Sequence, residues 1–445
     1  MSIPVITIFD IGKTNKKVFL FDEDYKIRFE KSIQLTEIKD EDDFPCEDIH
    51  ALTQWVKDSF NELLRLSEFK INAINISAHG ASFVHIDKIG NPIAPLYNYL
   101  KPFPDELKNQ FYNAYGGENE FSRITASPVL GNLNSGMQLY WFKHERPEIF
   151  KRIKYSLHLP EYISYLFSGK PVSGITSIGC HTNLWDFTKN NYHDWIKKEG
   201  VLEKLAPIVS STEVTTISTQ QNKINVGIGL HDSSAALIPY LSCFSEPFIL
   251  LSTGTWCISL NPFNQIQLTE EELKKDCLCY LTYQGKPVKA SRLFAGFEHE
   301  KEVKILAEHF HTSEDYYKHV SYQPELITRF ASQSYQPENL SGYTSYEEAY
   351  TQFIRSLVEQ QVLSTRIVLH NSHVTRIFVD GGFSNNPIFM NLLSVAFPSI
   401  EVYAASVAQA SATGAAMAIH KQWNKHPHKA DMIDLKFFSS KESTT

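Results

Sequence analysis

The chain contains one local pattern twice, and this repetition restricts the folds that it can adopt. Each copy has an apolar strand, a short polar turn with glycine, and a second apolar strand, which is typical of β-hairpins. Two matching hairpins predict two halves of related architecture, with a boundary near residues 239–247. The copies span residues 6–22 and 248–260, with the turns Asp10-Ile-Gly12-Lys13-Thr14-Asn15 and Ser252-Thr-Gly254-Thr255.

The first turn has the residues of an anion-binding site. Gly12 permits unusual backbone angles and leaves room for a ligand, and backbone N–H groups in such a turn can surround an anion. Asp10 is a candidate to hold a hydrated metal ion beside that anion. The turn is not a P-loop, because Thr7 stands where that motif needs glycine and a strand follows instead of a helix. From the residues alone, it is either a phosphate cradle or a plain hairpin turn.

Length and charge exclude several classes of protein. A chain of 445 residues predicts two or three domains. With 42 Lys and Arg against 50 Asp and Glu, the net charge of −8 argues against binding along a nucleic-acid backbone. The six cysteines are scattered, which favours reduced thiols over a zinc site. With no signal peptide or membrane span in the sequence, we expect a cytoplasmic protein.

Strand-like and helix-like segments alternate along the chain. Residues 48–66 have apolar side chains at helical spacing, and residues 71–77 and 84–86 are strand-like. Further helices are expected at 135–168, 268–279 and 408–419, and the tail from residue 436 is expected to be mobile. A strand at 376–382 ends in Gly381 and Gly382, which allow close backbone contact with a ligand. This alternation predicts an α/β fold with helices covering a sheet.

Polar side chains follow two of the predicted strands. His79 and Gly80 come after the strand at 71–77, and Asp232 lies between a strand and a helix of small residues. Because open α/β sheets bind ligands at the ends of their strands, His79 could hydrogen-bond a polyol beside Gly80, and Asp232 could be a general base or metal ligand. The alternatives are a loop histidine satisfied within the protein and an aspartate that caps a helix.

Taken in order, these motifs resemble those of the FGGY carbohydrate kinases, within the superfamily that has the actin and Hsp70 ATPase fold. The resemblance runs through most of the chain, and the ordered set is much more specific than any single motif. The two glycine turns resemble the family's phosphate loops. The other similar segments are Ala78-His79-Gly80 at the sugar, Gly229-Leu-His-Asp232 at the catalytic base, and Asp380-Gly-Gly-Phe-Ser-Asn-Asn386 with Thr413-Gly-Ala-Ala416 at the adenosine.

The resemblance implies an α/β protein with two actin-like ATPase (ribonuclease H-like) domains and a central cleft. Residues 1–242 would bind the sugar and carry the first phosphate loop, and residues 243–445 would bind the nucleotide. The implied reaction is ATP-dependent phosphorylation of a hydroxyl of a small ketose or polyol, with Asp232 as general base and Mg²⁺ near Asp10. The implied ligands are a sugar and ATP, with no nucleic acid or membrane, and the chain could form a homodimer.

The resemblance also implies which residues contact the ligands. The substrate would lie against His79, Gly80 and Asp232. The nucleotide and its phosphates would lie against Gly12, Lys13, Thr14, Asn15, Gly254, Thr255, Gly381, Gly382 and Asn386.

Two departures from the family pattern concern the sugar and phosphate contacts. Lys13 stands where the first loop usually has a hydroxyl residue, and residues 96–103 lack the Asp and Arg of the usual Trp-Asp-x-Arg pattern. A looser likeness of residues 291–297 to rhamnulose kinases favours a deoxy-ketose such as L-rhamnulose or L-fuculose. The alternatives are an inactive or sugar-sensing member of the family, and an ATP-regulated clamp of the actin or Hsp70 type that binds protein.

Overall fold

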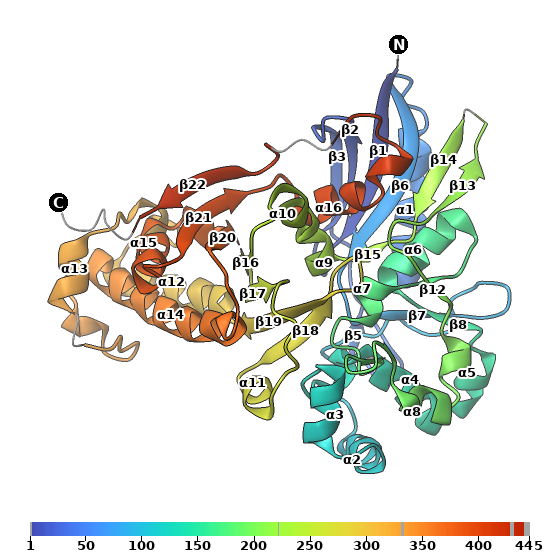
Figure 1. Cartoon of the computed structure of the whole chain (residues 1–445), viewed down its shortest axis with the longest axis horizontal. Helices are drawn as coiled ribbons and strands as arrows, with labels where there is room; N and C mark the ends of the chain where they lie inside the picture. The colour runs from blue at the N-terminus through green and yellow to red at the C-terminus, as the bar shows by residue number, and fades with distance from the viewer. Residues whose placement is uncertain (1, 221, 331–332, 428–430, 440–445) are drawn as a thin grey trace.

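Two seven-stranded mixed sheets organise the protein and lie side by side (Figure 1). The computed structural model describes residues 2–220, 222–330, 333–427 and 431–439. The first sheet contains β1 (Ile3–Ile11), β2 (Lys16–Asp22), β3 (Ile27–Ile33), β6 (Phe69–Ala78), β13 (Val214–Ser218), β14 (Lys223–Gly227) and β15 (Leu230–His231). The second contains β16 (Phe248–Thr253), β17 (Cys257–Asn261), β18 (Cys277–Leu281), β19 (Pro287–Leu293), β20 (Arg376–Gly381), β21 (Glu401–Ser406) and β22 (Asp434–Phe438).

The two sheets repeat one topology, as the matching hairpins predict. In each, a central strand pairs antiparallel with its hairpin partner and parallel with a strand from farther along the chain: β2-β1-β6 in the first sheet and β17-β16-β20 in the second. The parallel register places Asp10 beside Ser77 and Thr253 beside Gly381. Each glycine turn therefore lies at the carboxyl edge of its sheet, where α/β folds bind ligands.

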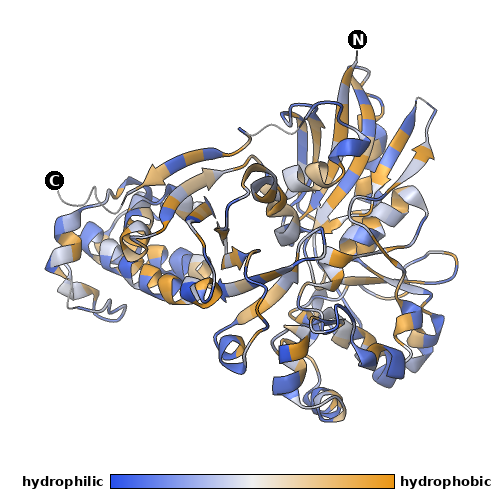
Figure 2. Cartoon of the chain, viewed as in Figure 1, coloured by the Kyte–Doolittle hydropathy of each residue, from blue (hydrophilic) through white to orange (hydrophobic). Residues whose placement is uncertain are grey.

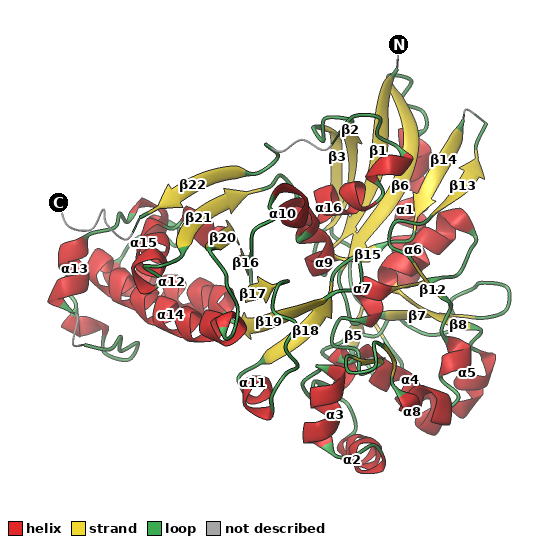
Figure 3. Ribbon diagram, viewed as in Figure 1, coloured by secondary structure: helices red, strands yellow, loops and turns green. Residues whose placement is uncertain are grey.

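Helices cover both sheets (Figure 3). The first half also has four two-stranded sheets, which pair β4 (Ile38–Lys39) with β5 (Pro45–Cys46), β7 (Phe83–Ile86) with β8 (Tyr155–His158), β9 (Ser173–Gly174) with β12 (Ile208–Val209), and β10 (Trp185–Asp186) with β11 (Asn191–Tyr192). Its helices are α1 (Ile49–Leu63), α2 (Asp105–Ala114), α3 (Glu118–Thr125), α4 (Ser135–Glu145), α5 (Pro147–Arg152), α6 (Leu159–Ser168), α7 (Ile175–Ile178), α8 (Asp194–Lys198), α9 (Asp232–Ala236) and α10 (Ile238–Cys243).

The second half has fewer and longer helices. The 24-residue α14 packs against α12, α15 and the strands β17 and β19. The helices are α11 (Glu270–Lys274), α12 (Ala295–Phe310), α13 (Pro324–Arg329), α14 (Tyr346–Leu369), α15 (Pro387–Ala396) and α16 (Ala410–Ala418), with short 3-10 turns η3 (Tyr316–His319) and η5 (Gly382–Asn385).

Continuous apolar strands form the two cores. The first sheet's central strand has Val5, Ile6, Ile8, Phe9 and Ile11 fully buried, because helices cover both of its faces. Figure 2 shows the same orange runs along the central strands of the sheets. Within the described residues, no helix is both long and apolar enough to span a membrane.

Helix α16 follows the second sheet in the chain but packs on the first (Figure 1). Its alanines share a core cluster with Ile6 and Ile8, and Asn75 donates a hydrogen bond to the Ala415 carbonyl at 2.8 Å. A side chain at Gly414 would lie 1.8 Å from the backbone oxygen of Ala235, so only glycine lets α16 and α9 approach this closely. The strands of the two large sheets lie on either side of residue 242 in the sequence. Helix α16 comes after residue 242 but packs on the first sheet. The expected domain boundary at 242/243 stays a prediction.

Three local predictions were wrong. Residues 277–281 form the buried strand β18, and only Glu270–Lys274 of the expected helix at 268–279 is helical, because a short apolar run does not distinguish a buried strand from a helix. Residues 155–158 form strand β8 within the expected helical stretch at 135–168. Residues 434–438 pair with β21 as strand β22, so the expected mobile tail is ordered to that point; residues 440–445 lie outside the described part of the chain.

Candidate active site

The first glycine turn is closed by its own backbone and by a buried lysine. The Gly12 N–H donates to the Asn15 carbonyl at 3.0 Å. The Lys16 ammonium, which is almost fully buried, donates to the carbonyl oxygens of Gly12 at 3.0 Å and Lys13 at 2.8 Å. Thr14 and Asn15 remain exposed at the tip of the turn. The turn is therefore preformed, with small polar residues presented to solvent.

Asp10 and Asp232 meet at one edge of the first sheet. Strands β1 and β15 both pair with β6, with Asp10 opposite Ser77 and His231 opposite Ala78, so both aspartates lie near the carboxyl edge of this sheet. Burial and then the charge of Asp232 raise the pKa of Asp10 to about 6, although a hydrogen bond from Ser411 at 3.1 Å opposes the shift. Two carboxylates beside a phosphate-sized turn form an acidic centre that favours a bound cation.

Asp232 has one engaged and one free carboxylate oxygen. Its Oδ1 accepts from the Ser233 N–H at 2.6 Å and the Ser233 hydroxyl at 3.3 Å, and lies 3.2 Å from His231 Nε2. Among the described residues, Oδ2 has no hydrogen-bond partner, and 37% of the side chain is exposed. Asp232 is the first residue of α9 and not its N-cap, which is His231. Because Oδ1 nevertheless accepts a backbone N–H of the first turn of α9, the capping alternative agrees with the contacts of Oδ1 and does not account for the unengaged Oδ2.

His231 is held behind Asp232 by close packing. Burial lowers its pKa, so the ring is neutral and carries one N–H, which at Nε2 can point to Asp232 Oδ1. The same Nε2 lies 3.2 Å from Cys180 Sγ, and the buried Nδ1 has no partner among the described residues. A side chain at Gly80 would lie 2.9 Å from the His231 ring, so Gly80 has a steric role that the sequence did not indicate.

His79 lies at the predicted position but faces the protein. Only 7% of the residue is exposed; its Nε2 lies 3.0 Å from Glu47 Oε1 and its Nδ1 lies 3.1 Å from the Gly80 carbonyl oxygen. Both ring nitrogens therefore have partners within the protein, as the alternative of a satisfied loop histidine requires. A direct contact between His79 and a sugar stays a prediction. Glu47, which makes this contact, was not singled out from the sequence.

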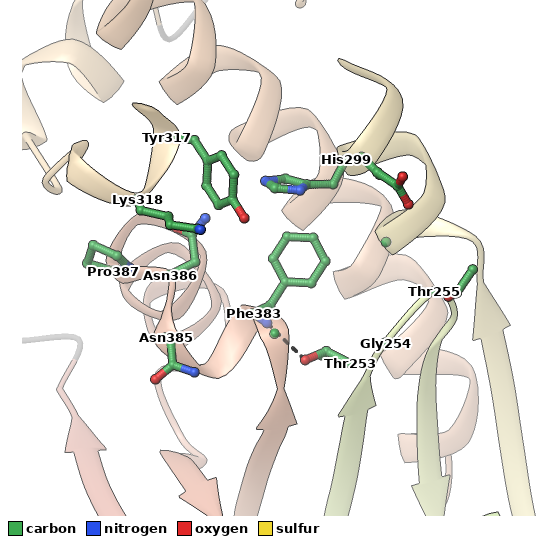
Figure 4. A pocket seen from close by; sticks show the side chains of 13 residues that line it. Thr253, Gly254, Thr255, His299, Tyr317, Lys318, Phe383, Asn385, Asn386 and Pro387 are labelled. Atoms are coloured by element: carbon green, nitrogen blue, oxygen red, sulfur yellow. Dashed lines mark hydrogen bonds between the residues drawn. The ribbon is translucent and has the colours of Figure 1, made fainter. Parts of the chain in front are cut away.

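The second glycine turn lines a cavity of about 590 Å³ in the second half of the chain. In Figure 4, Tyr317 and His299 lie on one side of this cavity, Thr253, Gly254 and Thr255 on the other, and Phe383 between them. The volume is that of a small-molecule site. The lining residues are Thr253, Gly254, Thr255, Gly296, His299, Glu300, Tyr317, Lys318, Gly382, Phe383, Asn385, Asn386 and Pro387.

Glycines bring three segments together at the base of this cavity. Gly381 has φ +91°, and a side chain there would lie 2.0 Å from the Thr253 carbonyl oxygen. A side chain at Gly296, in the first turn of the 16-residue helix α12, would lie 1.8 Å from the Gly254 oxygen. Thr253 completes the junction by donating to the Asp380 carbonyl at 2.6 Å. The second turn thus lies against a helix N-terminus, which favours anions.

Asn386 lines the cavity, but its side chain is engaged in the fold. Its oxygen caps α15 by accepting from the N–H groups of Ile388 and Phe389, both at 3.0 Å, and its nitrogen donates to the Tyr350 hydroxyl at 2.8 Å. Any contact of Asn386 with a ligand therefore involves its surface and not a free amide. The aromatic and cationic lining residues Tyr317 and Lys318 come from the 3-10 turn η3, whose role the sequence did not indicate.

The first predicted phosphate turn does not line the cavity at the second turn. The cavity is lined only by residues between 253 and 387, without Gly12, Lys13, Thr14, Asn15 or Asp232. The two halves are nevertheless connected beside the first turn, because α16 places Ser411 on Asp10, and Gln409 at its N-terminus lies 3.4 Å from Lys17. A joint site requires the two halves to close.

The acidic centre fits Mg²⁺ better than a metal bound by protein alone. In the described part of the chain, no group of three or more His, Cys, Asp and Glu side chains could hold a metal ion. Mg²⁺ characteristically takes one or two carboxylates together with waters and substrate phosphates. Asp10 and Asp232 supply that donor set beside the first turn.

The fold and these sites define a class of protein. Two related α/β halves, each with a glycine turn at the carboxyl edge of its sheet, and an acidic pair at the edge of the first sheet are features of the two-domain actin-like ATPase fold. The predicted fold class is therefore confirmed.

Comparison with protein-family models identifies the family. Residues 5–238 match the FGGY family of carbohydrate kinases, N-terminal domain, and residues 245–427 match the carbohydrate kinase FGGY, C-terminal domain. These matches cover most of the chain, which therefore belongs to the FGGY family of carbohydrate kinases. The family named from the sequence motifs is confirmed.

Individual relatives are more distant. The chain is 25% identical over 256 residues to a rhamnulokinase of Halalkalibacterium halodurans and 24% identical over 227 residues to one of Bacteroides thetaiotaomicron. These matches cover 56% and 47% of this chain, and about half of each relative's length, 52% and 44%.

Solved structures share the whole fold. A carbohydrate kinase from Novosphingobium aromaticivorans matches with a TM-score of 0.81 at 21% identity, covering 99% of this chain and 95% of that one. A ligand-bound xylulose kinase from Lactobacillus acidophilus matches with 0.81 at 15% identity, covering 98% and 94%. Plasmodium falciparum glycerol kinase with ADP matches with 0.74 at 16% identity, covering 99% and 94%.

Proposed function

We propose that this protein transfers the γ-phosphoryl group of ATP to a hydroxyl of a small ketose or polyol. The observation that carries the proposal is the meeting of Asp10 and Asp232 at one sheet edge, with Asp232 Oδ2 free and partly exposed. A general base needs an oxygen that is not already committed to the fold, and Oδ2 meets this requirement. Membership of a carbohydrate kinase family supports the same reaction.

In the proposed reaction, Asp232 Oδ2 accepts the proton of the attacking sugar hydroxyl. A bond forms between that hydroxyl oxygen and the γ-phosphorus, the bond from the γ-phosphorus to the bridging oxygen breaks, and ADP leaves with the electron pair. His231 and Ser233 hold Oδ1, so the base keeps one orientation throughout. The sugar lies in the first half of the chain, next to Asp232 and the segment at His79 and Gly80.

The two glycine turns are proposed to hold the phosphates. The backbone N–H groups of residues 13–15, and that of Thr255 beside the α12 N-terminus, offer donors to phosphate oxygens, whereas the N–H groups of Gly12 and Gly254 are bonded within their own turns. When bound near Asp10, Mg²⁺ would neutralise part of the phosphate charge. Because the cavity of the second half does not include the first turn, closure of the two halves would complete the site and exclude water.

The nucleotide base is proposed to occupy the cavity of the second half. Gly382 lines the cavity with no side chain to obstruct a ligand, whereas the predicted contact Gly381 is not among the lining residues, and Tyr317 adds an aromatic ring to the lining. Lys318 is a cation in the same lining and can approach the phosphates. A nucleotide would therefore reach from these residues to the second turn and, after closure, to the first.

The substrate class is proposed from the relatives. The partial match to rhamnulokinases, together with the likeness of residues 291–297, favours a deoxy-ketose such as L-rhamnulose or L-fuculose. A small-molecule kinase of this kind would act in the cytoplasm, where ATP is available.

A screen for sugar-dependent ADP release would test this proposal. The purified chain is incubated with Mg·ATP and a panel of ketoses, deoxy-ketoses and polyols. We expect release of ADP with at least one ketose, and transfer to that sugar confirmed by mass spectrometry. The absence of transfer across the whole panel would favour the second candidate, an inactive or sugar-sensing family member, which Lys13 and the altered stretch at 96–103 support. Both matching family models describe carbohydrate kinases, which argues against the alternative of an actin- or Hsp70-type clamp.

A further inference from the structure

Glu47 is a buried carboxylate that contacts both the first glycine turn and the segment at His79. It follows β5 and precedes α1, and 8% of its side chain is exposed. Its Oε1 lies 3.2 Å from Lys13 Nζ and 3.0 Å from His79 Nε2, and its Oε2 lies 2.7 Å from Lys16 Nζ. One side chain therefore joins two segments that are more than 60 residues apart in the chain.

The contacts of Glu47 also control the shape of the turn. Lys16 Nζ, its partner at 2.7 Å, donates to the Gly12 and Lys13 carbonyl oxygens that close the turn. Burial alone would raise the pKa of Glu47, but His79, Lys16 and Lys13 outweigh it and hold this pKa well below its usual range. Removing the negative charge would leave a buried ammonium without its counter-charge, which is strongly unfavourable.

The two departures from the family pattern meet at this place. Lys13 Nζ lies 5.7 Å from the ring centroid of Tyr99, which belongs to the stretch at 96–103 that lacks the usual Asp and Arg. The His79 and Tyr99 rings contact each other edge to face at 6.0 Å. Burial raises the pKa of the Tyr99 phenol, Lys13 opposes this, and the charges of Asp232 and Glu47 add to it, so Tyr99 lies within electrostatic range of the base.

We propose that Glu47 is a positioning and specificity-determining residue, which fixes the first glycine turn relative to the sugar-binding segment. Through Lys13 and His79 it also sets the position of Tyr99, so the two departures form one connected wall in place of the usual hydroxyl-reading contacts. The functional part of this inference rests on the proposed sugar kinase activity. Its structural part, the coupling of two segments by one carboxylate, does not.

The structural part is tested by hydrogen–deuterium exchange on the ligand-free chain. Glu47→Gln keeps the shape of the side chain and removes its charge. The matched control is Glu272→Gln, which breaks a contact of 2.8 Å with the similarly buried Lys289 in the second half. We expect amides at 10–17 and at 77–82 to exchange at least about tenfold faster in Glu47→Gln, while those at 252–257 and the control variant stay unchanged. Unchanged exchange at both segments would overturn the coupling.

The functional part is tested by the linkage between the two substrates. For a sugar that the wild type phosphorylates, we expect Glu47→Gln to raise the KM for the sugar about tenfold or more and to reduce the factor by which saturating sugar changes the KM for ATP. The Glu272→Gln control should keep both constants. Unchanged sugar constants and linkage in Glu47→Gln would overturn the positioning role, even with faster exchange.

The two parts of the proposal can be tested even if Glu47→Gln does not fold or the wild type phosphorylates no sugar. If Glu47→Gln does not fold, Lys13→Gln removes one of the three partners at a partly exposed position, and the same changes are expected in the same direction. If the wild type phosphorylates no sugar, the proposed function fails, and the exchange experiment alone decides whether Glu47 couples the two segments.

Discussion

His231 Nε2 lies 3.2 Å from Asp232 Oδ1, and the His231 side chain is buried whereas that of Asp232 is partly exposed. Together with the two donors of Ser233, this contact engages Oδ1, whereas Oδ2 of the same carboxylate has no hydrogen-bond partner among the described residues. In the proposed reaction, His231 and Ser233 would therefore fix the orientation of the carboxylate through Oδ1, and Oδ2 would accept the proton.

Asp232→Asn should nearly abolish turnover while nucleotide binding persists. The amide keeps the size of the side chain and cannot accept the hydroxyl proton, and general-base catalysis is worth about 10² to 10⁴ in rate. We expect kcat to fall by that factor and the Kd for Mg·ATP to change less than about threefold. Sugar phosphorylation at the wild-type rate would show that another group removes the proton.

His231→Ala should lower kcat by about tenfold or more, because the Asp232 carboxylate would lose its fixed orientation while keeping its ability to accept a proton. Without the ring, Oδ1 loses one of its neighbours and the carboxylate can rotate about its side-chain bonds. His231→Asn, which can still present a side-chain N–H, should recover part of the rate, whereas a merely structural loss would not be corrected in this way. Equal kcat values for His231→Ala and the wild type would show that His231 does not position the base.

Substituting Thr255 with a bulky residue should weaken nucleotide binding. Thr255 belongs to the second turn and lines the cavity, so a much larger side chain there would take up space that a bound nucleotide needs. For Thr255→Trp we expect a rise of about tenfold in the Kd for Mg·ADP, measured by calorimetry. An unchanged titration would remove the second turn from the nucleotide site.

Glu161→Gln should stabilise the protein at high pH. Glu161 is completely buried and burial raises its pKa to about 8, against the usual 4.5, although a hydrogen bond from Ser177 at 2.7 Å opposes the shift. The folded state therefore keeps the proton between pH 4.5 and 8 while the unfolded state releases it, and wild-type stability falls with rising pH in this window.

The prediction is checked by the difference in unfolding free energy between Glu161→Gln and the wild type. Relative to the wild type, the unfolding free energy of Glu161→Gln should rise by about 1.4 kcal/mol for each pH unit between 4.5 and 8 and then level off. Urea denaturation across this range checks it. A difference that does not vary with pH would mean that Glu161 is ionised in the folded state.

The sequence predicted those parts of the fold and site whose signals are local. Both hairpins, the paired glycines at 381–382 and the strand-to-helix position of Asp232 are recognisable from a few neighbouring residues, and each forms the predicted element. Strand β18 was missed, because a fully buried apolar run has no distinctive period.

The missed site residues depend on contacts between distant segments. Glu47 stands among other acidic residues in the sequence, next to Asp48, and becomes informative only when the fold brings it against His79, 32 positions away. Tyr317 and His299 likewise line the cavity from two separate elements, η3 and α12. The hydrogen bond from Asn386 to the Tyr350 hydroxyl could not be predicted for the same reason, because Tyr350 lies 36 residues earlier in the chain.

The return of α16 to the first sheet has a consequence for synthesis of the protein. Ile6 and Ile8 emerge from the ribosome early, yet part of the apolar surface that covers them arrives only with residues 410–418. The core of the first half is therefore completed only after nearly the entire polypeptide has been synthesised. A product truncated at residue 242 would expose this apolar surface and be prone to aggregate.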